Sequence, residues 1–354
     1  MGNKSKLTLV VDGNWLLMSR MPVLLNNRYA DERTVMKDVK LLMIKSINIV
    51  LKTFPDIDNV IVVSDGGSWR NDIPVPEFLK QASVEYKGNR EKSEDVNWDV
   101  IFEEYNNFVE LLNQSGINAV HETGIEGDDW CWYWSDLLNK QGTNVMIWTK
   151  DRDITQLVKT DSNGVFTIVW NKDNGVFMAH DTDDTQFLLN PYYQQNEAIL
   201  RNILNKSESH QIVNPLHVRL DKIIRGDLGD NILPIITRKA KTGEKTFRVQ
   251  EKHLPENIND IYNIYELLEY VNSLNDIKMY SGSILQSNEQ IIEHYIYNRQ
   301  LVVLDEQSYP ESIFEIFHKY DHYYSDHNIS NNVSVVESKI QAEVNTVTNI
   351  LNEI

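Results

Sequence analysis

The chain has 354 residues, of which 41% are hydrophobic, and its formal net charge is −18. This length exceeds one typical domain core, so we expect one larger domain and one smaller domain. The single cysteine, Cys131, excludes an internal disulfide and fits a reducing, cytoplasmic compartment. No apolar run is long enough for a membrane span, so we expect no membrane partner. The acidic balance argues against nucleic-acid binding except at local basic patches.

Two apolar runs near the start of the chain each lead into an aspartate. Residues 7–11 precede Asp12, and residues 60–63 precede Asp65, with a helical pattern over residues 35–54 between them. Acidic residues at the carboxyl ends of buried strands lie where open α/β sheets place their active sites. An aspartate in a turn before glycine would explain Asp12 alone equally well. The repetition favours a functional site.

Residues 67–97 break this pattern and mix aromatic with basic side chains. A solvated loop is one interpretation. Because the segment directly follows Asp65, we favour a mobile element that contacts phosphates and unstacked bases. Its candidate residues are Trp69, Arg70, Tyr86, Lys87 and Arg90.

A second group of acids follows further along the chain. Residues 99–112 predict a helix, residues 118–121 a strand, and residues 144–148 another strand. The alternation predicts an α/β domain with a largely parallel sheet. The acids of this group are Glu126, Asp128, Asp129, Asp151 and Asp153. Helix capping would explain those at the start of the helix that runs to about residue 139. So many clustered carboxylates repel one another, and a divalent metal is the usual way to neutralise them.

The stretch from residue 165 to residue 248 is mixed. Residues 165–170 and 175–178 predict a strand pair, and residues 184–204 a polar, weakly helical insertion, with the neighbouring Asp181, Asp183 and Asp184 solvated. Residues 216–226 predict a helix that leads into Asp227 and Asp230. A basic run then contains Arg238, Lys239, Lys241, Lys245 and Arg248 around Gly243. We expect a helix–turn–helix whose glycine turn approaches a phosphate, although a charged surface loop is the alternative.

The remaining chain is mainly helical. Helices are predicted over residues 260–272, 289–297 and 311–320, followed by a polar linker over residues 324–332. A final stripe runs from Val336 to Ile354 at helical spacing and either docks on the body, which we favour, or binds a partner. The expected domains are residues 1–214, with an arch segment at about 67–98, residues 215–325, and residues 326–354 as linker and amphipathic helix.

Taken in order, these motifs resemble the signatures of the flap endonuclease, or 5′-nuclease, family. The matching stretches are residues 10–14, Asp65, and residues 86–90, 125–129, 149–157, 226–231 and 243–246. The resemblance covers residues 7 to about 250 and agrees in order and spacing as well as in residue type. Its details are most similar to phage members such as the T-even ribonuclease H, which would place the protein in the host cytoplasm.

This resemblance implies a PIN-like, Rossmann-like α/β domain, a mainly helical C-terminal region with a helix–three-turn–helix, and two Mg²⁺ or Mn²⁺ ions. Asp12, Asp65, Glu126 and Asp128 would surround the first metal, and Asp151, Asp153, Asp227 and Asp230 the second, with Asp129 behind them. Lys87 and Arg90 would hold the scissile phosphate, and Arg20 matches an arginine of the first motif. The family's turn can also hold K⁺, although the stretch between Asn231 and Gly243 is longer here than in the bacterial polymerase I domain.

The implied activity is two-metal hydrolysis of phosphodiester bonds by a 5′-3′ exonuclease or flap endonuclease, with RNA-primer removal or RNase H activity as a further option. Its partners would be DNA with 5′ flaps, nicked or forked duplex, or an RNA·DNA hybrid, and replication-fork proteins at the C-terminal helix. One alternative is a haloacid dehalogenase-like phosphatase, which needs an aspartate where Asn14 stands. Another is a non-catalytic DNA-binding module, which would be expected to lose metal carboxylates.

Overall fold

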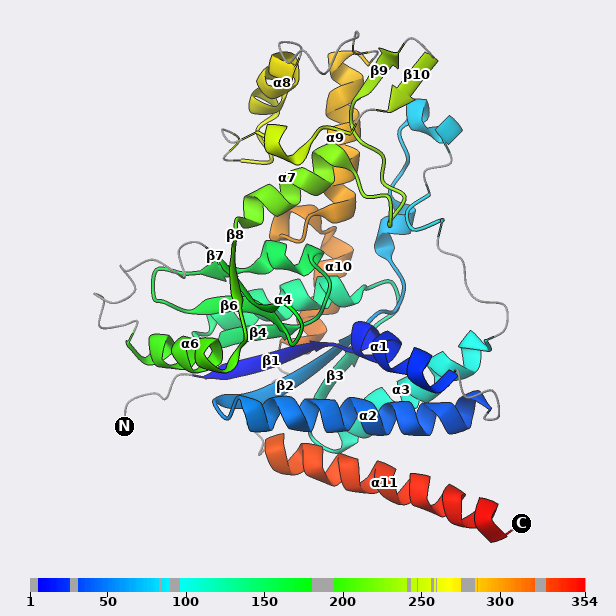
Figure 1. Ribbon diagram of the computed structural model, residues 1–354. Helices are drawn as coiled ribbons and strands as arrows, with labels where there is room; N and C mark the ends of the chain where they lie inside the picture. The colour runs from blue at the N-terminus through cyan, green and yellow to red at the C-terminus, as the bar shows by residue number, and fades with distance from the viewer. Residues whose placement is uncertain are drawn as a thin grey trace. The chain divides into compact units, whose positions relative to one another are not determined.

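The computed structural model describes residues 6–25, 31–82, 85–89, 96–179, 194–240, 243–246, 248–255, 258, 260–274, 284, 286–321 and 329–353. The chain divides into two compact units (Figure 1). The first unit comprises Met1–Ser68, Ser93–Val213 and Glu311–Ile354, and the second comprises Trp69–Lys92 and Asn214–Pro310. No helix in this described part of the chain is long and apolar enough to cross a membrane.

A mostly parallel sheet forms the centre of the first unit. Its strands lie in the order β3-β2-β1-β4-β6-β7-β8. Their bounds are β1 Leu7–Asp12, β2 Ile57–Ser64, β3 Asn118–His121, β4 Asn144–Trp148, β6 Phe166–Asn171, β7 Gly175–Ala179 and β8 His210–Val213. The β6–β7 pair is antiparallel, and so is the pairing of the short β5 (Lys159–Thr160) with β6. Every residue of β1 is buried, as expected of a central strand covered on both faces. The predicted fold class, with its strand pair near residue 170, is confirmed.

Helices α1 (Gly13–Leu25), α2 (Glu32–Thr53), α3 (Trp98–Gln114), α4 (Gly127–Lys140) and α6 (Gln194–Lys206) connect these strands. The sequence analysis did not predict α1, because this helix is too uniformly apolar to present a clear periodic face. Residues 180–193, with the three aspartates expected to be solvated, lie outside the described residues.

The C-terminal helix α11 (Ile329–Glu353) packs along α2, as Figure 1 shows. Its residues Val333, Val336 and Ile340 are buried in the core of the first unit. Polar contacts flank this seam, including a 2.6 Å hydrogen bond from Asn48 to the Glu337 carboxylate. The described part of the apolar stripe therefore docks on the body. The expected linker over residues 324–332 is wrong at its end, because the helix already begins at Ile329.

An aromatic cluster joins α4 to α10 (Glu311–Phe317) within the first unit. Phe317 is fully buried, stacks on Tyr133 at 4.7 Å between ring centroids, and meets Trp130 edge-on at 5.2 Å. Trp130, Trp132 and Trp134 are all buried, so all three pack in the core. The cluster fixes the body of α4, whose first turn carries Asp128 and Asp129.

Phe317→Ala is expected to lower the free energy of unfolding by about 3–5 kcal/mol, because it leaves a cavity among fixed aromatic rings. The measurement is the denaturant midpoint and slope by circular dichroism. Phe102→Ala is the matched control, because Phe102 lies in the same unit and is 39% exposed. A loss for Phe317→Ala no larger than that of the control would contradict this role.

The second unit is mainly helical, with a core of its own. Its helices are α7 (Pro215–Arg225), α8 (Ile264–Ser273) and α9 (Asn288–Val302), and short 3-10 helices lie at Trp69–Asp72, Glu77–Ala82 and Glu251–His253. Residues of the expected arch thus have regular structure. Leu79 packs with Ile232, Tyr297 and Leu301, so this part is not the solvated loop that was one interpretation of the sequence. That the segment is mobile and contacts phosphates and bases stays a prediction. Arg90 lies outside the described residues.

The basic run after α7 forms a β-hairpin. Strand β9 (Thr237–Ala240) pairs antiparallel with β10 (Gly243–Thr246), with Thr237 opposite Thr246. The expected helix–turn–helix is therefore wrong for these residues. The run has no apolar residues at helical spacing that could bury a helix face, whereas threonine favours strands. The expected K⁺ site stays a prediction.

Candidate metal centre

Carboxylates of the first unit gather at the carboxyl edge of the parallel sheet. Asp12 ends β1, Asp65 directly follows β2, and Asp151 lies three residues after the end of β4. Strand β1 pairs in parallel with both β2 and β4, with Asp12 opposite Val63 and Val11 opposite Trp148. The strands therefore deliver these three side chains to one edge.

Hydrogen bonds connect Asp12 to the loop after β4. The Thr149 hydroxyl donates to Asp12 Oδ2 at 2.8 Å and accepts the amide of Asp151 at 3.0 Å. The amide of Asp153 donates to Asp151 Oδ1 at 2.8 Å, and the amide of Trp15 donates to Asp12 Oδ1 at 2.9 Å. Each carboxylate is thus held by groups from its own loop or from a neighbouring strand end.

A second set of contacts joins the loop after β2 to the start of α4. The Gly127 amide donates to Asp65 Oδ1 at 2.5 Å, and a Cβ at Gly127 would lie 2.9 Å from that oxygen, so only glycine fits without a shift. The Glu126 amide donates to Asp129 Oδ2 at 3.1 Å. Asp129 is fully buried and caps the helix, so its contact orients the backbone of Glu126.

Burial and neighbouring negative charges shift the pKa values of side chains at this edge of the sheet. Burial raises the pKa of Asp12 to about 7, with a smaller contribution from the charges of Asp65 and Asp151 and an opposing one from the hydrogen bonds of Trp15 and Thr149. Burial also raises the pKa of the Cys131 thiol, and the charges of Asp12, Asp128, Asp65 and Asp151 add to this effect. Four carboxylates therefore act on one buried atom. A site of this kind gains stability from a bound cation.

The metal-free protein is expected to lose stability as pH rises from about 4 to 7. Unfolded Asp12 ionises near its ordinary pKa of 3.8, whereas folded Asp12 stays protonated until about 7. The folded state therefore holds the extra proton across this window. Its advantage disappears above pH 7, at a cost on the order of 4 kcal/mol at most.

Denaturant unfolding of the chelated protein at pH 5 and pH 8 measures this difference. Asp12→Asn is the matched variant, because it cannot ionise and should reduce the pH dependence. Equal pH dependence in the two proteins would contradict a raised pKa at Asp12.

The predicted acids divide between the two units. Asp12, Asp65, Glu126, Asp128, Asp129, Asp151 and Asp153 belong to the first unit, and Asp227 and Asp230 belong to the second. Asp227 forms an ion pair with Lys222. Burial raises the pKa of Asp227, but the hydrogen bond and charge of Lys222 outweigh this effect, so the pKa lies below its ordinary value. The role of both second-unit acids as metal ligands stays a prediction.

The predicted DNA-binding residues have varied environments. Arg20 donates to Ser46 Oγ at 3.1 Å between α1 and α2. Arg70 is only 2% exposed and lies over the Trp69 ring at 4.7 Å, so its guanidinium is not displayed for a phosphate. Tyr86 packs beside the Leu79 cluster. Arg238, Lys239 and Lys245 lie on the hairpin strands, Arg248 is exposed, and Lys241 lies outside the described residues.

Sequence reasoning missed two polar residues at the sheet edge. Thr149 links Asp12 to Asp151, as described above. Asn14 Oδ1 accepts the amide of Asp65 at 3.2 Å and so connects the first two strand ends. Thr149 directly follows one predicted strand and Asn14 stands three positions after another, and this closeness to a strand end was the available signal.

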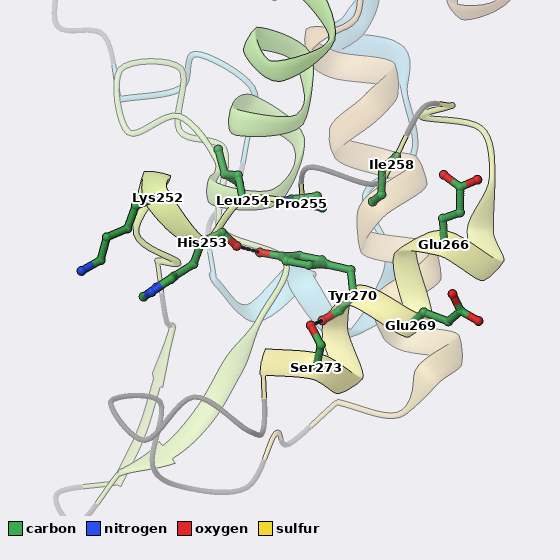
Figure 2. Close-up of a pocket in the computed structure, with 9 residues that line it drawn as sticks. All are labelled: Lys252, His253, Leu254, Pro255, Ile258, Glu266, Glu269, Tyr270 and Ser273. Atoms are coloured by element: carbon green, nitrogen blue, oxygen red, sulfur yellow. Dashed lines mark hydrogen bonds between the residues drawn. The ribbon is translucent and has the colours of Figure 1, made fainter.

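A cavity of about 370 Å³ lies in the second unit, between α8 on one side and residues 252–255 and Ile258 on the other. Figure 2 shows the Tyr270 hydroxyl directed at the backbone carbonyl of His253, to which it donates at 2.9 Å. The Lys252 and His253 side chains project from one side of the view, and Glu266 and Glu269 lie on the other. None of the predicted site residues lines this cavity.

The chain has a mostly parallel α/β sheet with carboxylates gathered at its carboxyl edge. This arrangement is typical of α/β proteins with an acidic metal site. The family model for the 5′-3′ exonuclease N-terminal resolvase-like domain matches residues 8–187, which is half of the chain. The chain therefore belongs to the 5′-3′ exonuclease N-terminal domain family, and the predicted 5′-nuclease resemblance is confirmed.

Individual relatives support the same assignment. The 5′-3′ exonuclease of Buchnera aphidicola subsp. Acyrthosiphon pisum (strain APS) is 25% identical over 149 residues, which cover 42% of this chain and 46% of that protein. The chain thus spans less than half the length of this curated relative.

Solved structures of T5 proteins share the fold. The T5 D15 protein co-crystallized with metal ions is 16% identical, with 94% of this chain and 100% of that chain covered and a TM-score of 0.50. The T5 5′-exonuclease with bound divalent zinc is 17% identical, with 89% and 98% covered and a TM-score of 0.50. At these identities the likeness concerns the fold alone.

Proposed function

We propose that the protein is a metal-dependent 5′ nuclease that hydrolyses phosphodiester bonds in DNA. The observation that carries this proposal is the convergence of Asp12, Asp65 and Asp151 at the carboxyl ends of three adjacent parallel strands, where hydrogen bonds link Asp12 to Asp151 through Thr149 and Asp65 to the start of α4 through Gly127. Membership of the 5′-3′ exonuclease domain family supports the same activity. A phosphatase of the haloacid dehalogenase type gains no support, because Asn14 is engaged with the Asp65 amide.

The residues at the sheet edge fit divalent metal. Their donors are carboxylate oxygens, which Mg²⁺ and Mn²⁺ prefer, and a cation would neutralise the charges of Asp65 and Asp151, which add to burial in raising the pKa of Asp12. Asp12, Asp65, Glu126 and Asp128 would hold one ion, and Asp151 and Asp153 would contribute to the second, with Asp227 and Asp230 as further predicted ligands. Bound metals would supply an activated water and stabilise the leaving oxygen.

The chain's own groups would prepare this site for substrate. Thr149 fixes the orientation of the Asp12 carboxylate by donating to Oδ2. The lone pairs of the carboxylate that Thr149 does not use would be available to a metal ion. Asp129 orients Glu126 through the backbone, and Gly127 leaves space for Asp65. Lys87 would bind the scissile phosphate as it gains charge in the transition state, together with Arg90.

The preferred substrate would be a junction of duplex with a 5′ single strand or 5′ end. Because the protein carries a net charge of −18, binding should be confined to the local basic stretches over residues 69–92 and 238–248. The test uses a 5′-flap, a nicked duplex, a forked duplex and an RNA·DNA hybrid, each labelled at either end, with Mg²⁺. Early release of short products from the 5′ label supports the proposal, and degradation from the 3′ end contradicts it.

Contacts with replication-fork proteins at α11 and a cytoplasmic location stay predictions. In the described part of α11, the apolar stripe from Val333 to Val344 packs on the core of the first unit. Along these residues a partner would have to use the opposite face of the helix, where Val335 is 41% exposed.

Lys245→Ala should weaken DNA binding and reduce the salt slope of log affinity by about one unit, because each phosphate contact releases about one counterion. Turnover at saturating DNA should change little. Lys87→Ala should lower turnover at saturating DNA and change the binding affinity little, since Lys87 would act on the transition state. Binding titrations at several salt concentrations and single-turnover cleavage separate the two. An unchanged slope with lost turnover in Lys245→Ala would contradict this division.

A further inference from the structure

Within the second unit, the turn that carries Lys87 is hydrogen-bonded to the turn that carries Asp227 and Asp230. The Lys87 amide donates to the Asp230 carbonyl at 3.0 Å, and Asn89 Nδ2 donates to the Leu228 carbonyl at 2.8 Å. In the other direction, Asn231 Nδ2 donates to the Glu85 carbonyl at 3.0 Å. Two segments about 140 residues apart in sequence are thus joined at their tips.

The backbone at this junction adopts an uncommon conformation. Lys87 and Asn231 have φ values of +55° and +59°, and no other non-glycine residue of the described chain has a positive φ. Asparagine tolerates this region, but lysine does so only at a cost, so its surroundings must hold it there. The hydrogen bond from the Lys87 amide to Asp230 is one such restraint.

Both turns are also anchored separately. Tyr86 packs against the cluster of Leu79 and Ile232, and the Lys87 ammonium lies 4.9 Å from the centroid of the Tyr86 ring. On the other side, Asp227 and Ile232 exchange backbone hydrogen bonds at 2.9 and 2.7 Å, and the Gly229 amide donates to Asp227 Oδ1 at 2.8 Å. Each of the two turns that meet is therefore held in place by contacts of its own.

We propose that Asn89 and Asn231 are positioning residues that hold Lys87 in register with the acidic turn. This inference rests on the proposed function, in which Lys87 binds the scissile phosphate and Asp227 and Asp230 bind metal. The two asparagine side chains hold Lys87 at a fixed distance from Asp227 and Asp230. The phosphate that Lys87 would bind and the metal that the acids would bind are then held at a fixed spacing. Such preorganisation lowers the activation barrier without tightening ground-state binding.

The first test is a double-mutant cycle between Asn89 and Lys87. Asn89→Ala should lower kcat about tenfold with little change in KM, since it removes one of the hydrogen bonds that join the Lys87 turn to the acidic turn. In the Lys87→Ala background the same change should cost almost nothing further, because its effect acts through Lys87. Equal losses in both backgrounds would overturn the proposal.

A matched control separates positioning from general stability. Asn263→Ala removes another asparagine of the second unit, which caps α8 by accepting the amides of Tyr265 and Glu266. It should lower thermal stability but leave kcat unchanged. An equal fall of kcat in Asn263→Ala and Asn89→Ala would show a merely structural role and overturn the proposal.

A readout independent of cleavage distinguishes this inference from the proposed function. Asn231→Gly keeps the positive φ but removes the contact to Glu85. Hydrogen exchange of the Lys87 amide should become about tenfold faster in Asn231→Gly and in Asn89→Ala. Unchanged protection would overturn the inference even if the wild type cleaves DNA, whereas faster exchange in a protein that never cleaves would overturn the proposed function alone.

Discussion

Cleavage by Asp151→Asn is expected to fall on the order of a thousandfold or more, while DNA binding and folding are retained. The side chain is exposed, and its Oδ1 accepts the Asp153 amide, a contact that the asparagine oxygen can keep. What changes is one negative charge beside Asp12. A metal ion would lose a ligand, but the loop would keep its shape.

Single-turnover cleavage and binding titrations with the same oligonucleotide measure this effect. Asp173→Asn is the matched control. Asp173 lies in the same unit, in the turn between β6 and β7, and forms an ion pair with Lys150. This variant should cleave at the wild-type rate. Wild-type cleavage by Asp151→Asn would show that Asp151 is not part of the metal centre.

Removal of divalent metal is expected to abolish cleavage, and Mg²⁺ or Mn²⁺ should restore it. In the proposed mechanism the nucleophile is a water that bound metal activates, so removal of the metal removes the nucleophile. Metal should also raise the unfolding temperature, since it binds the folded state and neutralises mutual repulsion.

The experiment compares chelated protein with protein titrated with Mg²⁺, following both cleavage and thermal unfolding. Asp12→Asn should lose most of the metal-dependent rise in unfolding temperature, whereas Asp173→Asn should keep it. Full cleavage after exhaustive chelation would overturn the two-metal hypothesis.

The sheet was predictable because its local signals agree with its tertiary environment. Residues 7–11 are apolar except for the β-branched Thr8, and all of them are buried, as expected of a central strand covered on both faces. The same reasoning located Asp12 and Asp65, because acids that end buried strands must emerge at one edge of a parallel sheet. Family motifs added Glu126 and Asp128, whose positions at a helix start are ambiguous on their own.

The hairpin and α1 could not be predicted from local sequence pattern. Residues 237–246 carry charge without periodicity, so pairing between strands decides their structure, and the family pattern misled the sequence interpretation. In α1 the apolar side chains surround much of the helix, which removes the periodic signal.

The sequence by itself determined the parallel α/β architecture, the family and the identity of the candidate metal carboxylates, because these depend on local pattern and residue order. Only the tertiary structure decided how they are held. Thr149 bridges Asp12 and Asp151, Gly127 makes room for Asp65, and Asn89 and Asn231 join two turns about 140 residues apart. Such contacts depend on distances between chain segments that no local pattern encodes.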